Sequence, residues 1–539
     1  MKNLIVVAIV VITCFASCEA NEKFLKEEPF GRLFPDNFMN NLQELELMNM
    51  GLYNLFGGVN GPLELPFQSF EIKYASSDDI IGTGNQRACF HDIEINMEFT
   101  SRSNDDIQLG WQRTYNCINQ ANAIINNYRN AESTMSEDEL NKWAAQAYFI
   151  RALSYFRLVL FFNNVPLVLD DYNPDMKREI TCSSSKDVYE VIISDLQFAE
   201  QWLPVKWTGT MMKGGAVTKG AAKATLAKVY LQMAGFPVNG GTEYYAKARD
   251  KAKEIIDHAD EYGYGLYDHF WQLWDANWSA YERPVEEAII WLVHTTSHYT
   301  QRAPNPSRPN ELGFGGWEMM VAELGFYNRF PEGERKEFTF VTDFYHSNGS
   351  HYHFTELRCA HPCYRKWWAD NLTTGWEWDK RDEPDSKWKS GMNLTSTWFS
   401  SRSIIVMRYA DVLLTYAEAK ARTDGPDELA YKCLNDVRNR AFKGLGTTEA
   451  SVSGLSTADF IDLVVWERAW EFAGMEYSAR WFDLQRLELV EKANTEWREE
   501  PEEKYRLARP YIKKDYFLPI PSKETVLNPN LKNNNPEFN

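Results

Sequence analysis

The sequence predicts a mostly α-helical protein in which paired helices are joined to one long, loop-rich region. Apolar residues recur at helical spacing over several long stretches. Two pairs of these stretches are separated by short turns, as in a helical hairpin. Between the two pairs, helical periodicity fades and Gly, Pro, Asn and aromatic residues become dense. These three observations define the predicted fold class.

Long helices are expected at 111–129, 142–162 and 183–203. The second has the strongest pattern, because its Ala, Tyr, Phe, Val and Leu residues gather on or near one face. We expect it to end at Asn163-Asn164-Val165-Pro166, since proline cannot continue a helix and Asn favours turns. The third begins with serines that can cap a helix and ends before Pro204.

Two helical hairpins are expected further along the chain. The first pairs 218–234 with 244–258, and the second pairs 408–422 with 429–442. Small residues at the expected crossing points resemble those of tetratricopeptide pairs, without the full consensus. The same Ala and Tyr spacing would suit any tightly packed helical hairpin, so the two pairs alone leave the repeat class open.

The region 263–403 differs from the rest of the chain. It holds more than half of the 19 Trp residues, together with a short apolar run at 287–294 that could form a strand. Long loops in a compact protein are usually functional. We therefore divide the mature chain into an N-terminal helical region at 29–262, this loop-rich region, and a C-terminal region at 404–539.

Composition narrows the class of partner. The formal net charge is −19, and removal of residues 1–17 would take away Lys2 and make it more negative. Nucleic acid is disfavoured because phosphate contacts need clustered Lys and Arg, and direct adsorption to an anionic membrane is disfavoured for the same reason. A neutral ligand fits this composition best. The 539 residues exceed what one core usually serves, so two subdomains or one extended repeat array are expected.

The first residues predict export and lipid anchoring. A short basic start precedes an apolar run from Leu4 to Phe15, which is too short for a membrane span of about 20 residues but suits a signal peptide. The run ends in Phe15-Ala16-Ser17-Cys18, which resembles a bacterial lipobox. We expect a signal peptide at 1–17, a lipid on Cys18 and a tether at 18–28; a plain secretory signal with an unmodified cysteine is the alternative.

Several segments together resemble the SusD/RagB family of outer-membrane nutrient-binding lipoproteins. They are the helix from Ala147 through the Val165-Pro166 turn, the helix from Arg408 to Ala419, the Glu467–Arg486 segment, and the ending from Leu518 to Pro536. These matches follow the family's order and span nearly the whole mature chain. The resemblance implies a SusD-like helical fold with a loop-built ligand surface, an outer-membrane location facing outward, and a TonB-dependent, SusC-like transporter as partner. It implies no catalytic role and no cofactor.

Candidate ligand contacts are aromatic residues with polar neighbours, because sugar rings stack on flat apolar faces while their hydroxyls need hydrogen-bonding groups. Most lie in the loop-rich region, and two lie in an early segment that the resemblance associates with an aromatic platform. For any single Trp, burial in the core is the competing interpretation. The residues are Trp271, Trp274, Asn277, Trp278, Trp317, Trp376, Trp378, Asn85 and Arg87.

Two further clusters of polar residues are not interpreted as catalytic or metal-binding sites. Glu467, Arg468, Glu471, Arg480 and Asp483 have spacings that suit ion pairs, so a structural role is expected. The group His351, His353, Cys359, His361 and Cys363 could suggest zinc, but its spacing is loose; thiols are favoured over a Cys359–Cys363 disulfide or a metal site.

The function expected is nutrient capture, with an oligo- or polysaccharide as the favoured ligand. A secreted helical glycoside hydrolase would also be acidic and Trp-rich, and it needs two carboxylates roughly 5–10 Å apart. The chain would also suit a peptide- or glycoprotein-binding member of the same family, or a scaffold for protein partners. The sequence does not identify the ligand.

Overall fold

The computed structural model describes residues 38–57, 70–83, 89–170, 180–208, 215–274, 285–292, 307, 309–311, 316–345, 350–366, 404–443, 450–474, 476–477, 480–498 and 505–531. The predicted signal peptide, Cys18 and the tether lie outside these residues. Among the described helices, none is long and apolar enough to cross a membrane.

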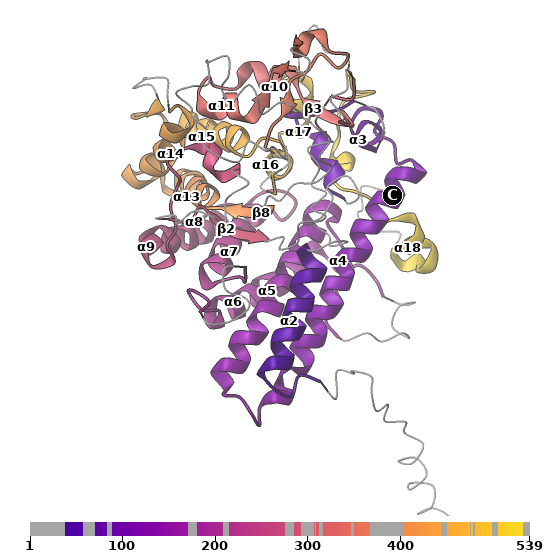
Figure 1. Cartoon of the computed structure of the whole chain (residues 1–539), viewed down its shortest axis with the longest axis vertical. Coiled ribbons are helices and arrows are strands. Elements are labelled where there is room, and N and C mark those ends of the chain that lie inside the picture. The colour runs from indigo at the N-terminus through magenta and orange to yellow at the C-terminus, as the bar shows by residue number, and fades with distance from the viewer. Residues whose placement is uncertain are drawn as a thin grey trace, which may run out of the picture.

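Long helices form most of the molecule (Figure 1). The longest is α4, which begins at Ser101 because the hydroxyl of Thr100 accepts a hydrogen bond from the backbone N–H of Ser103 at 3.2 Å. The longer helices are α2 (Leu42–Gly57), α4 (Ser101–Asn127), α5 (Glu137–Phe162), α6 (Ser185–Trp202), α7 (Lys219–Ala234), α8 (Gly241–Asp257), α13 (Tyr409–Asp424), α14 (Glu428–Ala441) and α15 (Thr457–Glu471).

The end of α5 is where the sequence predicted it. Asn163 caps this helix with a φ of 63°, a positive value that Asn tolerates better than most residues. The chain then turns, and the backbone N–H of Ser183 donates to the carbonyl of Val165 at 3.0 Å. This contact returns the chain to the start of α6, so α5 and α6 form a hairpin.

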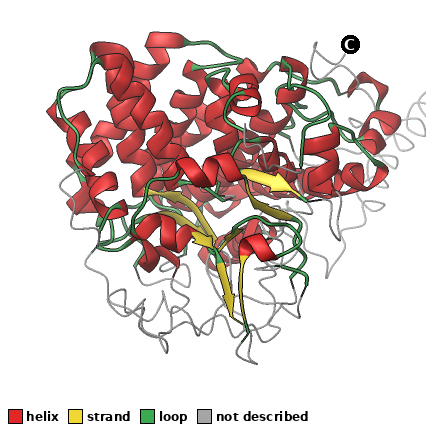
Figure 2. Ribbon diagram, turned by 90° about the horizontal axis from the view of Figure 1, so that it is seen from above, coloured by secondary structure: helices red, strands yellow, loops and turns green. Residues whose placement is uncertain are grey.

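Consecutive helices pack against one another as a curved layer (Figure 2). The chain order of these contacts is α4 with α5, α5 with α6, α6 with α7, and α7 with α8; α8 then contacts α13, which also contacts α14 and α15. The hairpins α7–α8 and α13–α14 confirm the two predicted pairs, and they pack against each other through α8 and α13. The mostly helical fold class, with its paired helices, is confirmed.

Short helices complete the described part of the chain. They are α3 (Cys89–His91), α9 (Ala259–Tyr262), α10 (Leu324–Arg329), α11 (Glu334–Thr339), α16 (Arg480–Arg486), α17 (Val490–Thr495) and α18 (Ser522–Leu527), with short 3-10 helices such as η3 (Phe70–Ser76) and η7 (Phe270–Trp274).

The described strands form four antiparallel pairs, which lie to one side of the helical layer in Figure 2. The pair β2–β8 joins the predicted strand at 287–294 to the residues directly before α13, with Leu292 opposite Ile404. The pairs are β1 (Ile80–Gly82) with β3 (Met320–Ala322), β2 (Ala288–Leu292) with β8 (Ile404–Arg408), β4 (Phe340–Val341) with β7 (Cys363–Tyr364), and β5 (Asp343–Tyr345) with β6 (His351–His353).

One hydrophobic cluster extends through most of the described chain, from Met39 to Leu531. Two smaller clusters lie beside it. One contains Val341 and Phe344 together with the buried Cys359 and Cys363, and the other surrounds η7. The described parts of the N-terminal and C-terminal regions therefore share a core.

Candidate ligand-binding site

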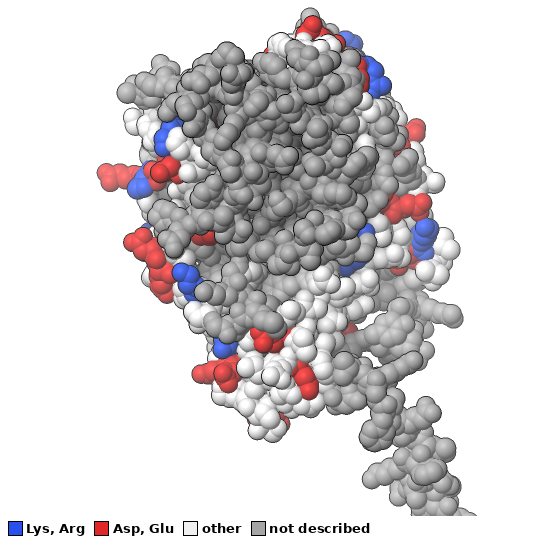
Figure 3. All heavy atoms as spheres, in the orientation of Figure 1, with Lys and Arg blue, Asp and Glu red and all other residues white. Residues whose placement is uncertain are grey.

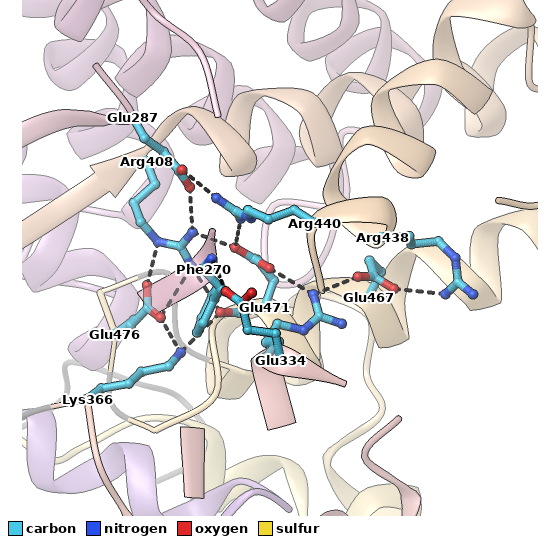
Figure 4. A network of polar contacts seen from close by, with 11 residues as sticks. Phe270, Glu287, Glu334, Lys366, Arg408, Arg438, Arg440, Glu467, Glu471 and Glu476 are labelled. Carbon is cyan, nitrogen blue, oxygen red and sulfur yellow. Dashed lines mark hydrogen bonds and ion pairs between the residues drawn. The ribbon is translucent and has the colours of Figure 1, made fainter. Parts of the chain in front are cut away.

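A network of buried ion pairs fixes the strand β2 and the turn η7, both of which lie in the predicted loop-rich region (Figure 4). Glu471 is at its centre, with Arg335 at 2.8 Å and Arg408 and Arg440 each at 2.5 Å. Burial alone would raise the pKa of Glu471, but these three guanidinium groups outweigh it and hold the pKa well below its ordinary value. The carboxylate is therefore ionised and structural.

The network reaches β2 through Glu287. Its carboxylate pairs with Arg408 at 3.2 Å and with Arg440, and it also accepts from the backbone N–H of Tyr267 at 2.9 Å. Arg408 is the last residue of β8, and its side chain also bonds Glu476 at 2.9 Å. Strand β2 and the segment before η7 are thus held by the same buried charges.

A second set of contacts fixes η7. The backbone N–H of Phe270 donates to Glu334 at 2.7 Å, and the ring of His269 bonds the other oxygen of the same carboxylate at 2.6 Å. The ammonium of Lys366 lies 5.2 Å from the ring centre of Phe270 and 5.3 Å from that of Trp274. A cation over two aromatic rings contributes to holding this turn in place.

The structural interpretation of the predicted charged cluster agrees with its burial and pairing. Arg335 also bonds Glu467 at 2.7 Å, while Arg468 pairs with Asp483 at 2.8 Å. Arg480 pairs with Asp78, 2.9 Å away and more than 400 residues earlier in the chain, with neither side chain exposed. These residues join distant elements rather than line a cavity.

The structure describes three of the predicted aromatic contacts. Trp271 and Trp274 lie together on η7; Trp271 is half-buried, whereas Trp274 has 4% of its surface exposed and packs in the apolar cluster around this turn. Trp317 is half-buried and packs against the main core instead. For Trp274 this burial favours packing, and a ligand contact by any of the three stays a prediction. Asn277, Trp278, Trp376, Trp378, Asn85 and Arg87 lie outside the described residues.

A cleft of about 580 Å³ lies between the helices and β2. One wall comes from α2 and α5, a second from the segments beside Trp207 and Thr218, and a third from residues 262–264 and 285–290. The volume is within the range of small-molecule sites. Because the third wall belongs to the segment fixed by Glu287, the buried charges position one side of the cleft.

Aromatic side chains are prominent in this cleft. The rings of Tyr262 and Tyr264 are stacked, with centres 5.5 Å apart and planes at 26°. Trp207 donates its indole N–H to the carbonyl of Val217 at 2.7 Å, and the Tyr53 hydroxyl accepts from the N–H of the same residue at 3.0 Å. Hydrogen bonds to the backbone of Val217 therefore fix the polar ends of the Trp207 and Tyr53 rings.

Polar groups complete the lining. The hydroxyls of Thr218 and Tyr264 are 3.2 Å apart, and the carboxylate of Glu286 accepts from the Tyr267 hydroxyl at 2.5 Å. Lys206 and Thr208 are exposed at the edge. Among the described lining residues, Glu286 is the one carboxylate, whereas a glycosidase uses a pair.

The residues of this cleft were not predicted from the sequence. They come from separate helices and turns, and each alone has the pattern of a core residue. One local signal could have identified part of it: Tyr262-Gly263-Tyr264-Gly265 alternates aromatic residues with glycines shortly after the helix predicted at 244–258. Gly263 has a φ of 73°, which favours glycine at that position.

The His and Cys group does not form a metal site within the described part of the chain. His351 bonds Asp343 at 2.8 Å, His353 bonds Thr355 at 2.9 Å, and the ring of His361 bonds the carbonyl of Cys359. Cys359 and Cys363 are buried thiols rather than a disulfide.

The described surface in Figure 3 carries Lys and Arg side chains singly among Asp and Glu, rather than as a continuous basic stripe. The cleft gives this helical protein a concave site that is lined mainly by aromatic and aliphatic side chains.

Solved structures share the fold. A SusD homologue from Bacteroides thetaiotaomicron matches with a TM-score of 0.71 and 23% identity, covering 94% of this chain and 99% of that one. A laminarin-binding SusD-like protein matches with a TM-score of 0.64 and 21% identity, covering 91% and 98%. A structure solved with a xylogluco-oligosaccharide matches with a TM-score of 0.64 and 22% identity over the same shares.

Sequence relatives and family models agree with the fold. A SusD-like protein of Formosa agariphila is 28% identical over all of both chains, and one of Bacteroides ovatus is 24% identical over 90% of this chain and 82% of its own. The model of the SusD family matches residues 333–538, and a model described as starch-binding associating with outer membrane matches residues 23–231. The chain therefore belongs to the SusD/RagB family.

Proposed function

We propose that this protein captures an oligo- or polysaccharide at the cell surface and delivers it to a TonB-dependent transporter of the outer membrane. The observation that carries the proposal is the aromatic cleft of about 580 Å³, in a fold shared with solved proteins named for laminarin and for a xylogluco-oligosaccharide. Those ligands belong to the neighbours; the class of ligand, a glycan, is what we extend to this chain.

The chemistry of the cleft suits a neutral sugar. The apolar C–H face of a pyranose ring can pack on Tyr262 or Trp207, while ring hydroxyls exchange hydrogen bonds with hydroxyl, carboxylate and ammonium groups at the edge. An anionic ligand would meet Glu286 and an overall charge of −19. The predicted ligand contacts remain part of the proposal, separately from the residues of the cleft. They are Trp271, Trp274, Trp317, Asn277, Trp278, Trp376, Trp378, Asn85 and Arg87.

Binding to a glycan panel tests the proposal. The mature chain without its lipid anchor is titrated with polysaccharides and followed by tryptophan fluorescence and calorimetry. Tyr262→Ala should weaken binding about tenfold, because it removes a half-buried ring that lines the cleft. Tyr244→Ala is the matched control, since Tyr244 is a half-buried tyrosine on α8 that does not line the cleft.

The outcomes separate the candidate functions. Binding without release of reducing sugar supports capture, whereas cleavage of the bound polysaccharide supports the glycoside hydrolase. Binding that is equal in Tyr262→Ala and the wild type excludes the cleft. If binding is lost instead on replacing Trp271 and Trp317 together with Trp278, Trp376 and Trp378 by Ala, the predicted Trp surface is the site. Binding to peptides alone favours a peptide-binding function.

The proposal includes a lipid on Cys18, with the signal peptide of residues 1–17 removed. Two acyl chains on one cysteine suffice for stable anchoring. Labelling cells with a palmitate analogue should tag the wild type and leave Cys18→Ser unlabelled. Protease applied to intact cells should degrade a surface-facing protein, and full protection would contradict the outward orientation.

The transporter partner is proposed from family membership. Crosslinking in outer-membrane fractions, followed by purification of this chain, should recover a TonB-dependent barrel protein. Recovery of this chain alone, under conditions in which glycan uptake requires it, would contradict a stable complex.

A further inference from the structure

A second cavity lies next to the cleft and has no role in the function proposed above. It is a groove of about 630 Å³ between α8, the segment 265–268, α13 and α14. The three helices lie side by side in Figure 1. Leu266, Leu413 and Leu429 are among its apolar lining residues, with the rings of Tyr267 and Tyr409. Polar side chains surround this floor.

The groove and the cleft are separate but share a wall. Tyr264 lines the cleft and Tyr409 lines the groove, and their ring centres are 6.3 Å apart. Tyr267 lines the groove, and its hydroxyl donates to Glu286, which lines the cleft. The backbone N–H of Tyr409 also donates to the carbonyl of Glu287 at 2.8 Å. These side chains therefore lie between the cleft and the groove, which share no lining residue.

Charge in the groove is already compensated. Lys432 pairs with Asp436 at 2.6 Å, and Lys443 donates to the carbonyl of Asp268 at 2.9 Å. Arg440 is held by Glu287 and Glu471 in the buried network. An anion would meet two carboxylates beside lysines that are engaged, and the described residues form no group of three metal-binding side chains here. An ionic ligand is therefore disfavoured.

The remaining groups suit a polyhydroxylated neutral ligand. Asn439 offers an amide, Tyr409 a phenol hydroxyl, and Asp268 an exposed carboxylate, so the groove presents both donors and acceptors. The walls at α8, α13 and α14 are helical and offer no strand edge for an extended peptide to join. Apolar and aromatic surface beneath these groups can pack on the face of a sugar ring.

We propose that this groove is a second sugar-binding site, independent of the cleft. This inference rests on the proposed glycan-binding function, because it assigns the same class of ligand to a different surface. Each site is expected to hold a separate short oligosaccharide, so the chain binds two molecules.

Calorimetric stoichiometry tests the inference on the mature chain, using a laminarin hexasaccharide and a xylogluco-oligosaccharide as probes. The wild type should bind two molecules of a recognised probe. The double variant Asn439→Ala/Tyr409→Phe should retain one, because loss of two hydrogen-bonding groups weakens the groove roughly tenfold or more. The variant Tyr262→Ala should retain the other.

The control is Ser451→Ala. The Ser451 hydroxyl donates to Asn439 at 3.0 Å but does not line the groove, so this variant loses the same local hydrogen bond and should still bind two molecules. One molecule per wild-type chain, unaffected by the groove variant and lost in Tyr262→Ala, overturns the second site while the proposed function stands. If the wild type binds one molecule and only the groove variant loses it, the groove is the binding site and the cleft is excluded. Absence of binding to both probes in every form overturns the inference for these glycans, and the wider panel then decides the proposed function separately.

Discussion

At the scale of residues, buried charge is tolerated in this protein because each group has several partners. Glu471 contacts Arg335, Arg408 and Arg440, and none of these side chains is more than 3% exposed. Taking such ions out of water costs several kcal/mol each, and only multiple pairing offsets that cost. The network is therefore sensitive to the loss of one member.

Glu471→Gln should lower the free energy of unfolding by about 3–5 kcal/mol, because it leaves three buried guanidinium groups facing a neutral amide. Urea denaturation followed by circular dichroism measures this. Glu243→Gln is the control: its partner Lys247 is in an exposed pair, which is worth less than about 0.5 kcal/mol. Equal effects of the two substitutions would contradict the structural role of the network.

Lys73 predicts a pH dependence of stability. Burial lowers the pKa of its ammonium to about 7, although Asp515 and Glu94 oppose the shift. The unfolded chain has a Lys pKa of about 10.4 and so binds more protons than the folded chain between these values. Stability should therefore rise with pH in this window. Burial lowers the pKa of Lys366 to about 8, which adds to the same trend.

Unfolding free energies measured at pH 7, 8 and 9 check this expectation. The wild type should become more stable across the series, and Lys73→Met should show a smaller increase, since only the other buried lysines then contribute. Lys253→Met, at an exposed position paired with Asp257, should keep the slope of the wild type. A loss of wild-type stability from pH 7 to 9 would refute the lowered pKa assigned to Lys73.

At the scale of elements, the sequence predicted helices best where the apolar periodicity continued through the whole helix. The α5 and α7 helices end at the predicted residues, and both hairpins lie where the Ala and Tyr spacing placed them. Helix α4 begins at Ser101 rather than Trp111, because its first turns are polar and depend on the Thr100 cap rather than on an apolar stripe. The short strand pairs joining distant segments had no local signal apart from β2.

Gly220 illustrates a close approach between α7 and the cleft wall. A Cβ there would lie 2.5 Å from the hydroxyl oxygen of Tyr264, so alanine would force this ring to move. Gly220→Ala should therefore destabilise the protein and weaken glycan binding, although alanine normally favours a helix over glycine by roughly 0.5–1 kcal/mol.

Gly51 on α2 provides the matched control, because a Cβ there would meet nothing within 4 Å. Gly51→Ala should stabilise by about 0.5–1 kcal/mol and leave binding unchanged. Thermal melts and glycan titration of both variants give the comparison. Stabilisation by Gly220→Ala with normal binding would show that Tyr264 adapts without cost.

At the scale of the whole molecule, the sequence predicted the fold class and family but little of the site's geometry. Apolar periodicity and motif order are properties of continuous segments, whereas the cleft combines Tyr53, Trp207, Tyr264 and Glu286 from segments far apart in the chain. Likewise, spacing indicated that Arg480 is structural, but not that its partner is Asp78. Such long-range pairs depend on the tertiary arrangement, which no local pattern specifies.

These long-range contacts lead to a prediction about the boundary at residue 262, where the N-terminal helical region predicted from the sequence ends. Asp78 pairs with Arg480, Glu94 pairs with Arg498 at 2.7 Å, and the N–H of Leu518 donates to the carbonyl of Phe161 at 2.7 Å. A fragment of residues 18–262 would expose the buried carboxylates and the apolar face that packs against the C-terminal region. It should therefore lack a cooperative thermal transition, while the full mature chain unfolds in one transition. Differential scanning calorimetry of the fragment and the full mature chain, with circular dichroism to measure residual helix, tests this prediction. A fragment that melts cooperatively near the melting temperature of the full chain would show that the N-terminal helices form a domain of their own.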